Sequence, residues 1–339
     1  MVLNPRESGE YIAGIAKHVK INQDGVQRAA ELVLKGFLQQ DFNLNTWWKS
    51  HELNPKNRIL PFTLDWIFFV DTLNFSFWSE EGRDYKITYQ GKTYTGYWSL
   101  CAAVNRSIEE GFDITSPSNY SNISLEKLKH IFRSDTGVEI PLLDERHRIL
   151  LETGKCLVEK FNSTFATCVD FAKNNAEELL KIVLLNFASY RDEASIDGQS
   201  VSFYKRAQIL IGDIWVCFEG QGIGAFHDIE KLTIFADYRV PQALVYLEAM
   251  EYSDELLKTL KEDKLIDNGG RFEVEIRGCT IWTTELIWKV IKEKQKNGEV
   301  PKDLIINAIL IDNYLWQYRR DHAEEMEHIP FHKVRCIYY

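Results

Sequence analysis

The stretch ILIDNYLWQY (residues 309–318) is apolar over most of its surface when it is read at helical spacing, and isoleucines upstream extend that surface. A helix that is apolar nearly all round is buried. Asp312 nevertheless lies in the middle of this stretch. A buried, ionised carboxylate costs several kcal/mol unless it is paired, changes its pKa or faces a wet cavity. The stretch therefore predicts a buried helix that carries one acid in a special environment.

Helical patterns recur along the rest of the chain and predict a mainly α fold. Ser124 is expected to cap one helix, and Pro141 suits the first turn of another. The final helix is expected to begin near Pro301, with Asp303 in its first turn. The helical patterns cover residues 26–38, 124–132, 141–161, 176–187, 204–218, 253–263 and 284–296.

The β pattern is confined to two short regions. Residues 85–100 alternate β-forming residues around a Gln90-Gly91-Lys92 turn, which predicts a hairpin near residues 85–98. Residues 272–278 (FEVEIRG) are a second strand candidate. Repeats, low-complexity segments and long linkers are absent from the sequence. We therefore expect residues 1–339 to form a single domain, a compact helical body with a small β excursion.

Composition and charge exclude some classes of protein. Lys plus Arg is 40 and Asp plus Glu is 50, so the formal net charge is −10. An acidic surface argues against a large nucleic-acid footprint, because phosphate neutralisation dominates that kind of binding. It leaves room for a local basic pocket that holds one phosphate. Nine Trp among 13% aromatic residues suit a filled core, and also stacking on flat ligands.

The cysteines and the N-terminal sequence bear on the compartment. The six cysteines are scattered without a C-x-x-C pair, and most lie in apolar runs. We expect free thiols in a reducing compartment. The first residues lack the basic and apolar regions of a secretory signal, and membrane-spanning stretches are not evident. These features predict a cytoplasmic protein with no membrane association, and they leave the oligomeric state open.

Two motif-like strings fail on context. GQGIG (residues 220–224) follows a helix-like stretch rather than a strand, so a turn is favoured over a dinucleotide loop. HELNP (residues 51–55) has Pro55 where a zinc protease motif has its second His. The histidines offer no ligand-spaced set, so we expect no metal.

Acids set among apolar and aromatic residues are the strongest candidates for a site. Asp71 lies in an aromatic run, although an acid there often caps a helix or pairs with an Arg. Asp237 follows Phe235, and it could equally cap a helix or pair with Arg239. Asp312 gains nothing from capping in mid-helix, and a buried structural ion pair is the alternative for it.

Other polar residues have an ordinary interpretation beside the functional one. Asn313 and Gln317 share a face of the helix that carries Asp312, because they are four residues apart. Lys205 and Arg206 would usually form a solvated helix edge, but they are also candidates for holding a phosphate. His51 taken alone is more often a satisfied core histidine.

A pocket lined by aromatic rings and carboxylates suggests a small, flat, polar ligand such as a nucleobase or nucleoside. Aromatic faces stack on the ring, and a carboxylate accepts two N–H bonds from an edge like that of guanine. A second carboxylate beside a sugar can stabilise an oxocarbenium-like transition state or activate water. The residues alone therefore give a class of chemistry rather than a substrate.

Many strings along the whole chain resemble one family, the queuosine salvage proteins, which are queuosine 5′-phosphate N-glycosylases/hydrolases. The strings are LNPRES (3–8), HELNP (51–55), DTLNFSFWSE (71–80), GYWSLCAAVNR (96–106), ERHRIL (145–150), VSFYKRAQIL (201–210), FADYRVPQ (235–242), VEIRGC (274–279) and RCIYY (335–339). The resemblance implies hydrolysis of the N-glycosidic bond of queuosine 5′-monophosphate to queuine, a 7-deazaguanine-type base reused in tRNA modification, and ribose 5-phosphate. It also implies a helical fold like that of DNA glycosylases and no metal or cofactor.

The resemblance also assigns residues. It implies that Asp312 is the catalytic carboxylate near the anomeric carbon, that Phe235 stacks on the base and that Asp237 binds its aminopyrimidinone edge. His51 matches a ligand contact. Asn313 and Gln317 belong to the same site, where relatives can carry a Tyr and a carboxylate. Lys205 is a candidate for binding the 5′-phosphate.

The chemistry of a 7-deaza base favours a role for an ionised Asp312. Such a base has carbon in place of N7, so protonation of N7 cannot improve the leaving group. Stabilisation of the sugar cation must contribute more, and a carboxylate does so most strongly at low dielectric. The alternatives are a glycosylase acting on a base within nucleic acid, which net charge −10 disfavours, and a non-catalytic nucleoside-binding protein.

Overall fold

The architecture is mainly helical, as the sequence predicts, in a computed structural model that describes residues 1–39, 44–80 and 83–339. The first elements are α1 (Pro5–Ile15), β1 (Val19–Ile21), α2 (Gln23–Leu38), α3 (Leu44–Ser50), α4 (Phe62–Thr72), β2 (Lys86–Tyr89), β3 (Lys92–Thr95), α5 (Tyr97–Glu109), α6 (Pro117–Tyr120), α7 (Leu125–Ile131), α8 (Leu143–Lys160), α9 (Ala166–Ala172) and α10 (Ala176–Asn186). They are followed by β4 (Glu193–Ile196), β5 (Gln199–Ser202), α11 (Lys205–Cys217), α12 (Val240–Tyr246), β6 (Met250–Tyr252), α13 (Asp254–Lys261), α14 (Arg271–Lys296) and α15 (Ala308–Asp321), with short 3-10 turns at Ala188–Tyr190, Gly222–Gly224 and Ile229–Lys231.

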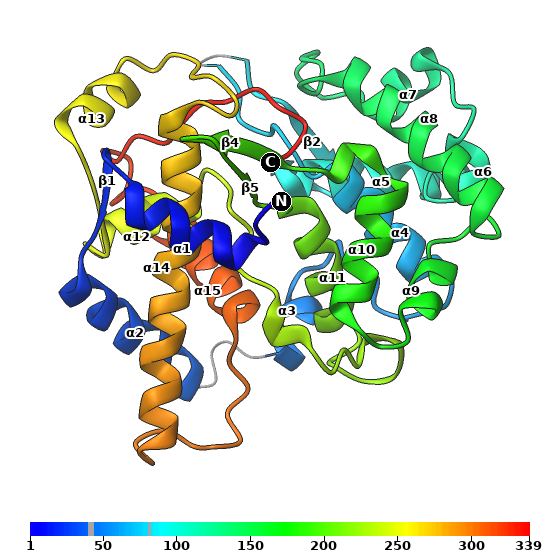
Figure 1. Ribbon diagram of the computed structural model, residues 1–339. Helices are drawn as coiled ribbons and strands as arrows, with labels where there is room; N and C mark the ends of the chain where they lie inside the picture. Colours follow the sequence, from blue (N-terminus) through cyan, green and yellow to red (C-terminus); the bar gives the residue numbers. More distant parts are fainter. Residues whose placement is uncertain (40–43, 81–82) are drawn as a thin grey trace.

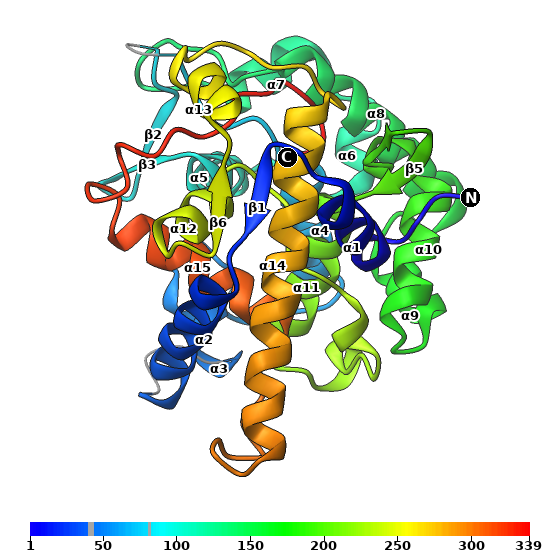
Figure 2. The ribbon, with the colours of Figure 1, turned by 60° about the vertical axis from the view of Figure 1, so that its left-hand side comes forward.

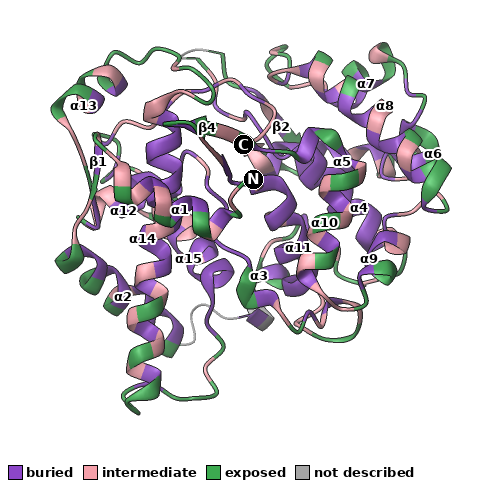
Figure 3. Ribbon diagram, viewed as in Figure 1, coloured by how far each residue is buried: buried purple, intermediate pink, exposed green. Residues whose placement is uncertain are grey.

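Two groups of helices lie side by side (Figures 1 and 2). The chain ends meet in one group, where α1 and α2 pack along α14, and α15 packs against α12 and α14. The middle of the chain forms the other group, in which α11 packs against α3, α4 and α10. The long helix α14 and the central helix α11 are the axes of the two groups. Helices α4 and α11 are buried on nearly every face, because other helices surround them (Figure 3).

The strands in the described part of the chain form small antiparallel pairs only. β2 and β3 are the predicted hairpin, with Tyr89 opposite Lys92 across the turn. The hairpin ends at Thr95, so residues 97–98, expected in its second strand, instead begin helix α5. β1 and β6 join the N-terminal region to residues 250–252, and β4 pairs with β5.

Helix caps agree with the sequence in part. Ser124 accepts a hydrogen bond from the backbone N–H of Lys127 at the start of α7, as predicted. Residues 26–38 lie within α2, which Asn22 caps. Pro141 precedes α8 rather than beginning it, because the helix starts at Leu143. The string GQGIG is a turn with a short 3-10 segment, as expected.

Two predictions about secondary structure are wrong. Residues 272–278 lie in α14 rather than in a strand, because their alternating polar residues are buried in ion pairs and do not mark an exposed face. The last helix begins at Ala308 rather than near Pro301. Asn307 caps it by accepting from the N–H of Leu310, and Gln295 donates to backbone carbonyls of the preceding loop. The likeness to DNA glycosylases stays a prediction.

Candidate active site

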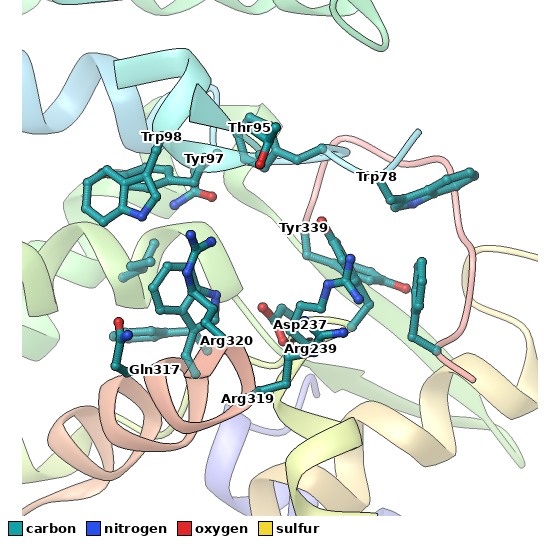
Figure 4. Close-up of a pocket in the computed structure, with 18 of the residues that line it drawn as sticks. Trp78, Thr95, Tyr97, Trp98, Asp237, Arg239, Gln317, Arg319, Arg320 and Tyr339 are labelled. Atoms are coloured by element: carbon teal, nitrogen blue, oxygen red, sulfur yellow. Dashed lines mark hydrogen bonds between the residues drawn. The ribbon is translucent and has the colours of Figure 1, made fainter. Parts of the chain in front are cut away.

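A cavity of about 810 Å³ lies where the two groups of helices meet. Its volume falls within the range of about 300–1,000 Å³ that is typical of small-molecule sites. Figure 4 shows Tyr97 and Trp98 of α5 across the cavity from Gln317, Arg319 and Arg320 of α15. Most of the lining comes from α5, α11, α15, the segment 235–239 and residues within 74–80, 83–85 and 331–339.

Asp312 lies on the cavity side of α15 and is 4% exposed. One of its carboxylate oxygens accepts a hydrogen bond from the backbone N–H of Phe235 at 3.0 Å. Within the described residues, no Lys, Arg or His comes within ion-pair distance of it. The buried structural ion pair considered from the sequence is therefore not what the structure contains, and the second oxygen is free to face a ligand.

The pKa of Asp312 is shifted upward, which disfavours the ionised carboxylate. Burial raises the pKa of this carboxyl well above its usual range, and the nearby charge of Asp237 adds to the rise. The N–H of Phe235 and the charge of Lys205 oppose it. Burial therefore acts against the ionised Asp312 that the sequence led us to expect. Positive charge in a ligand would favour ionisation, because an opposite charge stabilises the charged form.

Phe235 and Asp237 project from the segment between α11 and α12, and both line the cavity. The ring of Phe235 lies against Gly212 of α11, where an added Cβ would come within 2.8 Å of it, so only glycine leaves room for this ring. One oxygen of Asp237 accepts the backbone N–H groups of Arg239 (2.8 Å) and Val240 (2.9 Å) at the start of α12. Asp237 thus fixes the turn that leads into α12, whose N-cap is Arg239, and its other oxygen is left for the cavity that it lines.

Lys205 lines the cavity, whereas Arg206 does not. The Lys205 ammonium donates at 3.1 Å to both the backbone and the side-chain oxygen of Asn74, which also lines the cavity. Burial lowers its pKa, and nearby carboxyls, Asp237 first, oppose the fall. Arg206 is buried and donates to the backbone oxygens of Thr72 and Ser189, so its role is structural. The suggestion that Arg206 holds a phosphate is wrong.

Asn313 and Gln317 both line the cavity on α15, as their helical spacing predicts. Asn313 is buried, and its amide nitrogen has no hydrogen-bond partner within the described part of the chain. Gln317 donates to Asp321 at 2.7 Å. The amide nitrogen of Asn313 is therefore a buried donor without a partner, on a residue that lines the cavity.

His51 is not among the cavity-lining residues. Its ring stacks on Trp98, with the ring centroids 3.2 Å apart and the planes at 1°, and Trp98 is the residue that faces the cavity. Burial lowers the pKa of His51 to about 4, so the ring is neutral at physiological pH. His51 would therefore act on a ligand indirectly, by holding Trp98 in place at the cavity wall.

Asp71 lies behind the cavity wall and is fully buried. It accepts a hydrogen bond from Asn74 at 3.2 Å, and burial raises its pKa to about 7. Among the residues that the structure describes, it neither caps a helix nor forms an ion pair, so neither the cap nor the Arg partner considered for it is present there.

Sequence reasoning missed a buried acid of the site, Asp213 of α11. It lines the cavity and is 8% exposed. The same pattern that singles out Asp312, an acid in the middle of an apolar helix, occurs in ILIGDIWVCF at residues 209–218. That pattern would have found it.

A group of arginines at the cavity was also missed. Arg239, Arg319 and Arg320 line it, and none of them has a carboxylate within ion-pair distance in the part of the chain that the structure describes. Arg239 and Arg319 both donate to the side-chain oxygen of Gln242, at 3.1 and 3.2 Å. Burial and the two neighbouring arginines lower the pKa of Arg319 to about 10. Guanidinium groups without carboxylate partners fit a phosphate.

The site thus combines buried acids, aromatic walls and unpaired arginines in one cavity. This combination is typical of a small-molecule site, and it would fit a flat, polar ligand that carries a phosphate group. The described residues contain no helix long and apolar enough to cross a bilayer.

Comparisons with known proteins agree with that class and make it specific. The sequence profile of a family described as "Queuosine salvage protein" matches residues 53–339. The chain is similar to proteins named "Queuosine 5′-phosphate N-glycosylase/hydrolase" from Bos taurus (51% identical over 100% of this chain and 99% of the relative) and Mus musculus (50%, 99% of each). A relative of the same name from Schizosaccharomyces pombe is 38% identical over 98% of this chain and 99% of its own length. The chain belongs to the queuosine salvage protein family.

Proposed function

We propose that this chain is an enzyme that hydrolyses the N-glycosidic bond of queuosine 5′-monophosphate. The bond between C1′ and the base nitrogen breaks, the hydroxyl of water goes to C1′ and its proton goes to the base. The products are queuine, for reuse in tRNA modification, and ribose 5-phosphate. The observation that carries the proposal is a buried carboxyl, Asp312, that faces a cavity without a cation partner among the described residues.

Asp312 is the catalytic residue of this proposal. The N–H of Phe235 fixes one carboxylate oxygen, which leaves the other to lie against C1′. Positive charge develops on the ribose as the bond breaks, and it lowers the cost of ionising a carboxyl whose pKa burial has raised. A carboxylate that faces this charge in a water-poor cavity interacts with it more strongly than in water.

The remaining residues position the substrate. Phe235 stacks on the base, and the free oxygen of Asp237 accepts a hydrogen bond from it. Lys205 holds Asn74 and has a further N–H for the ribose, while Asn313 and Gln317 complete the wall of α15. His51 supports Trp98 from behind.

The 5′-phosphate binds to the arginines rather than to Lys205. Arg319 lies seven residues after Asp312 on α15, so their backbones are about 10 Å apart. A long side chain can bridge much of that distance toward a phosphate on the far side of the ribose. Arg239 adds a second guanidinium, tied to Arg319 through Gln242.

The protein acts in the cytoplasm as a single domain of residues 1–339 under this proposal. All six cysteines are free, and five of them are buried, which suits a reducing compartment. Most buried apolar residues, from Ile12 to Ile329, belong to one contiguous core, and a small second cluster contains Trp78, Tyr238, Val334, Cys336 and Tyr339. One dominant core suits a single domain.

Release of free base tests the proposed activity. The purified protein is incubated separately with queuosine 5′-monophosphate, with the nucleoside queuosine and with intact queuosine-modified tRNA, and queuine is followed by chromatography. We expect turnover of the mononucleotide and none of intact tRNA. Stoichiometric binding without product would make this a binding protein, and release from intact tRNA would favour a polymer-acting glycosylase.

A further inference from the structure

Asp213 is a buried acid of the cavity for which neither the resemblance nor the catalytic proposal has a use. It lies in the middle of α11, where it cannot cap the helix, and it is 8% exposed. Among the residues that the structure describes, none hydrogen-bonds to its carboxyl group or forms an ion pair with it. An acid so placed and so lacking partners is available to a ligand.

Acidic groups outnumber basic groups around Asp213. Asp71 and Asp312 act on it as like charges, and Lys205 is the cation that opposes them. Lys205 lies eight residues earlier on the same helix, about 12 Å away along its axis. The aromatic side chain of Tyr97 closes this end of the cavity. This end therefore has more acids than bases and would bind a cation favourably.

The substrate class carries one cation. Queuosine differs from plain 7-deazaguanosine by a substituent on the carbon that replaces N7, and this substituent contains a secondary amine. An alkyl amine of this kind is protonated near neutral pH, as a Lys side chain is. The amine nitrogen lies only a few bonds from C1′, on the side of the base where N7 would be. A group that binds it must therefore lie near the carboxyl that faces C1′.

We propose that Asp213 binds the protonated amine of the queuine substituent and so selects queuosine 5′-monophosphate over unsubstituted 7-deazaguanosine 5′-monophosphate. This inference rests on the proposed function. The pocket is then charged in opposite senses at its two ends, with arginines for the phosphate and Asp213 for the amine. Asp312 and Phe235 lie between them at the bond that breaks.

The test compares two substrates in two variants. For Asp213→Asn, which keeps the shape and removes the charge, we expect kcat/KM to fall about 10- to 100-fold for queuosine 5′-monophosphate, the usual effect of losing a hydrogen bond to a charged group. With 7-deazaguanosine 5′-monophosphate, which has no amine, kcat/KM should change little. The matched variant Asp237→Asn should lower kcat/KM for both substrates alike, because both carry the edge that Asp237 binds. Equal losses on both substrates with Asp213→Asn would overturn the proposal.

Equilibrium binding of the free bases separates this inference from the catalytic one. Queuine and 7-deazaguanine are titrated into wild type and Asp213→Asn by calorimetry, and only queuine should bind more weakly to the variant. This readout needs no turnover, so it stands even where hydrolysis fails. Asn relieves the burial of an acid, so the variant should fold at least as well as wild type, and a thermal melt checks this. Unchanged queuine affinity in a folded variant would disprove the role of Asp213.

Discussion

Two regions of this molecule bury charged groups, and they differ in whether those groups have partners. In α14, the guanidinium of Arg277 is 1% exposed and donates to both oxygens of Asp192 (2.9 and 2.6 Å) and to Glu273 (3.2 Å). On the cavity floor, Asp312 has one backbone N–H partner, and Asp213 has no polar partner among the described residues.

The comparison separates burial from function. A buried charge with a complete set of partners is explained by the fold, and removing one partner is what destabilises it. A buried charge without partners gains nothing for the fold and is retained at a cost. Missing partners, rather than burial itself, therefore mark the candidate site in this chain.

The largest effect is expected at Asp312. Asp312→Asn should reduce the rate of queuine release about 10³-fold or more while leaving the protein folded, because the amide cannot supply the negative charge that faces the ribosyl cation. Single-turnover assays with queuosine 5′-monophosphate measure it, and circular dichroism checks the fold. A variant that retains activity within tenfold of wild type, roughly 1.4 kcal/mol, would remove Asp312 from the centre of the mechanism.

The matched change in the paired region should act on stability. Asp192→Ala leaves Arg277 with Glu273 as its remaining carboxylate partner, and we expect the free energy of unfolding to fall by about 3 kcal/mol. Urea denaturation at neutral pH measures the loss. A change below about 1 kcal/mol would mean that this cluster is no more important to folding than an exposed ion pair, and the contrast between the two regions would fail.

A smaller effect is expected at the phosphate end of the cavity. Arg319→Gln should raise KM for queuosine 5′-monophosphate about 10- to 100-fold and leave KM for the nucleoside nearly unchanged, because only the nucleotide carries the anion. Arg148→Gln is the control, since Arg148 lies on α8 outside the cavity and pairs with Glu145 and Glu152. Equal weakening of nucleotide and nucleoside by Arg319→Gln would place the phosphate elsewhere.

The smallest effect concerns the pH dependence of stability. The pKa of Asp312 is higher in the folded protein than in the unfolded chain, where a carboxyl titrates near pH ~4. As the pH rises above that value, the unfolded chain loses a proton that the folded protein retains, so wild type loses stability relative to Asp312→Asn. Thermal melts between pH 5 and 8 should show the Asn variant gaining on wild type. The expected quantity is the melting temperature of Asp312→Asn minus that of wild type, and it should increase with pH. A decrease with rising pH would contradict the raised pKa.

Much of the candidate site could be predicted because its residues stand out against their local sequence. Asp312 interrupts an apolar helix, and Phe235 and Asp237 form a short polar-aromatic string, so neither needed knowledge of distant contacts. Asp213 carries the same local pattern and could have been found in the same way. The mainly α fold and the β2–β3 hairpin were likewise visible, because helical spacing and turn residues are local properties.

The sequence by itself determined the helical class, the hairpin and the presence of acids in apolar helices, since periodicity and composition express these over a few turns of chain. Only the tertiary structure decided which buried charges are satisfied: Asp192 meets Arg277 across 85 residues, whereas Asp312 meets a cavity. The same contacts turned residues 272–278 into a helix, buried Arg206 as a structural group and brought Arg319 to the site. The physical reason is that a charged group finds its partners through space, and one local stretch of sequence does not specify what lies opposite it.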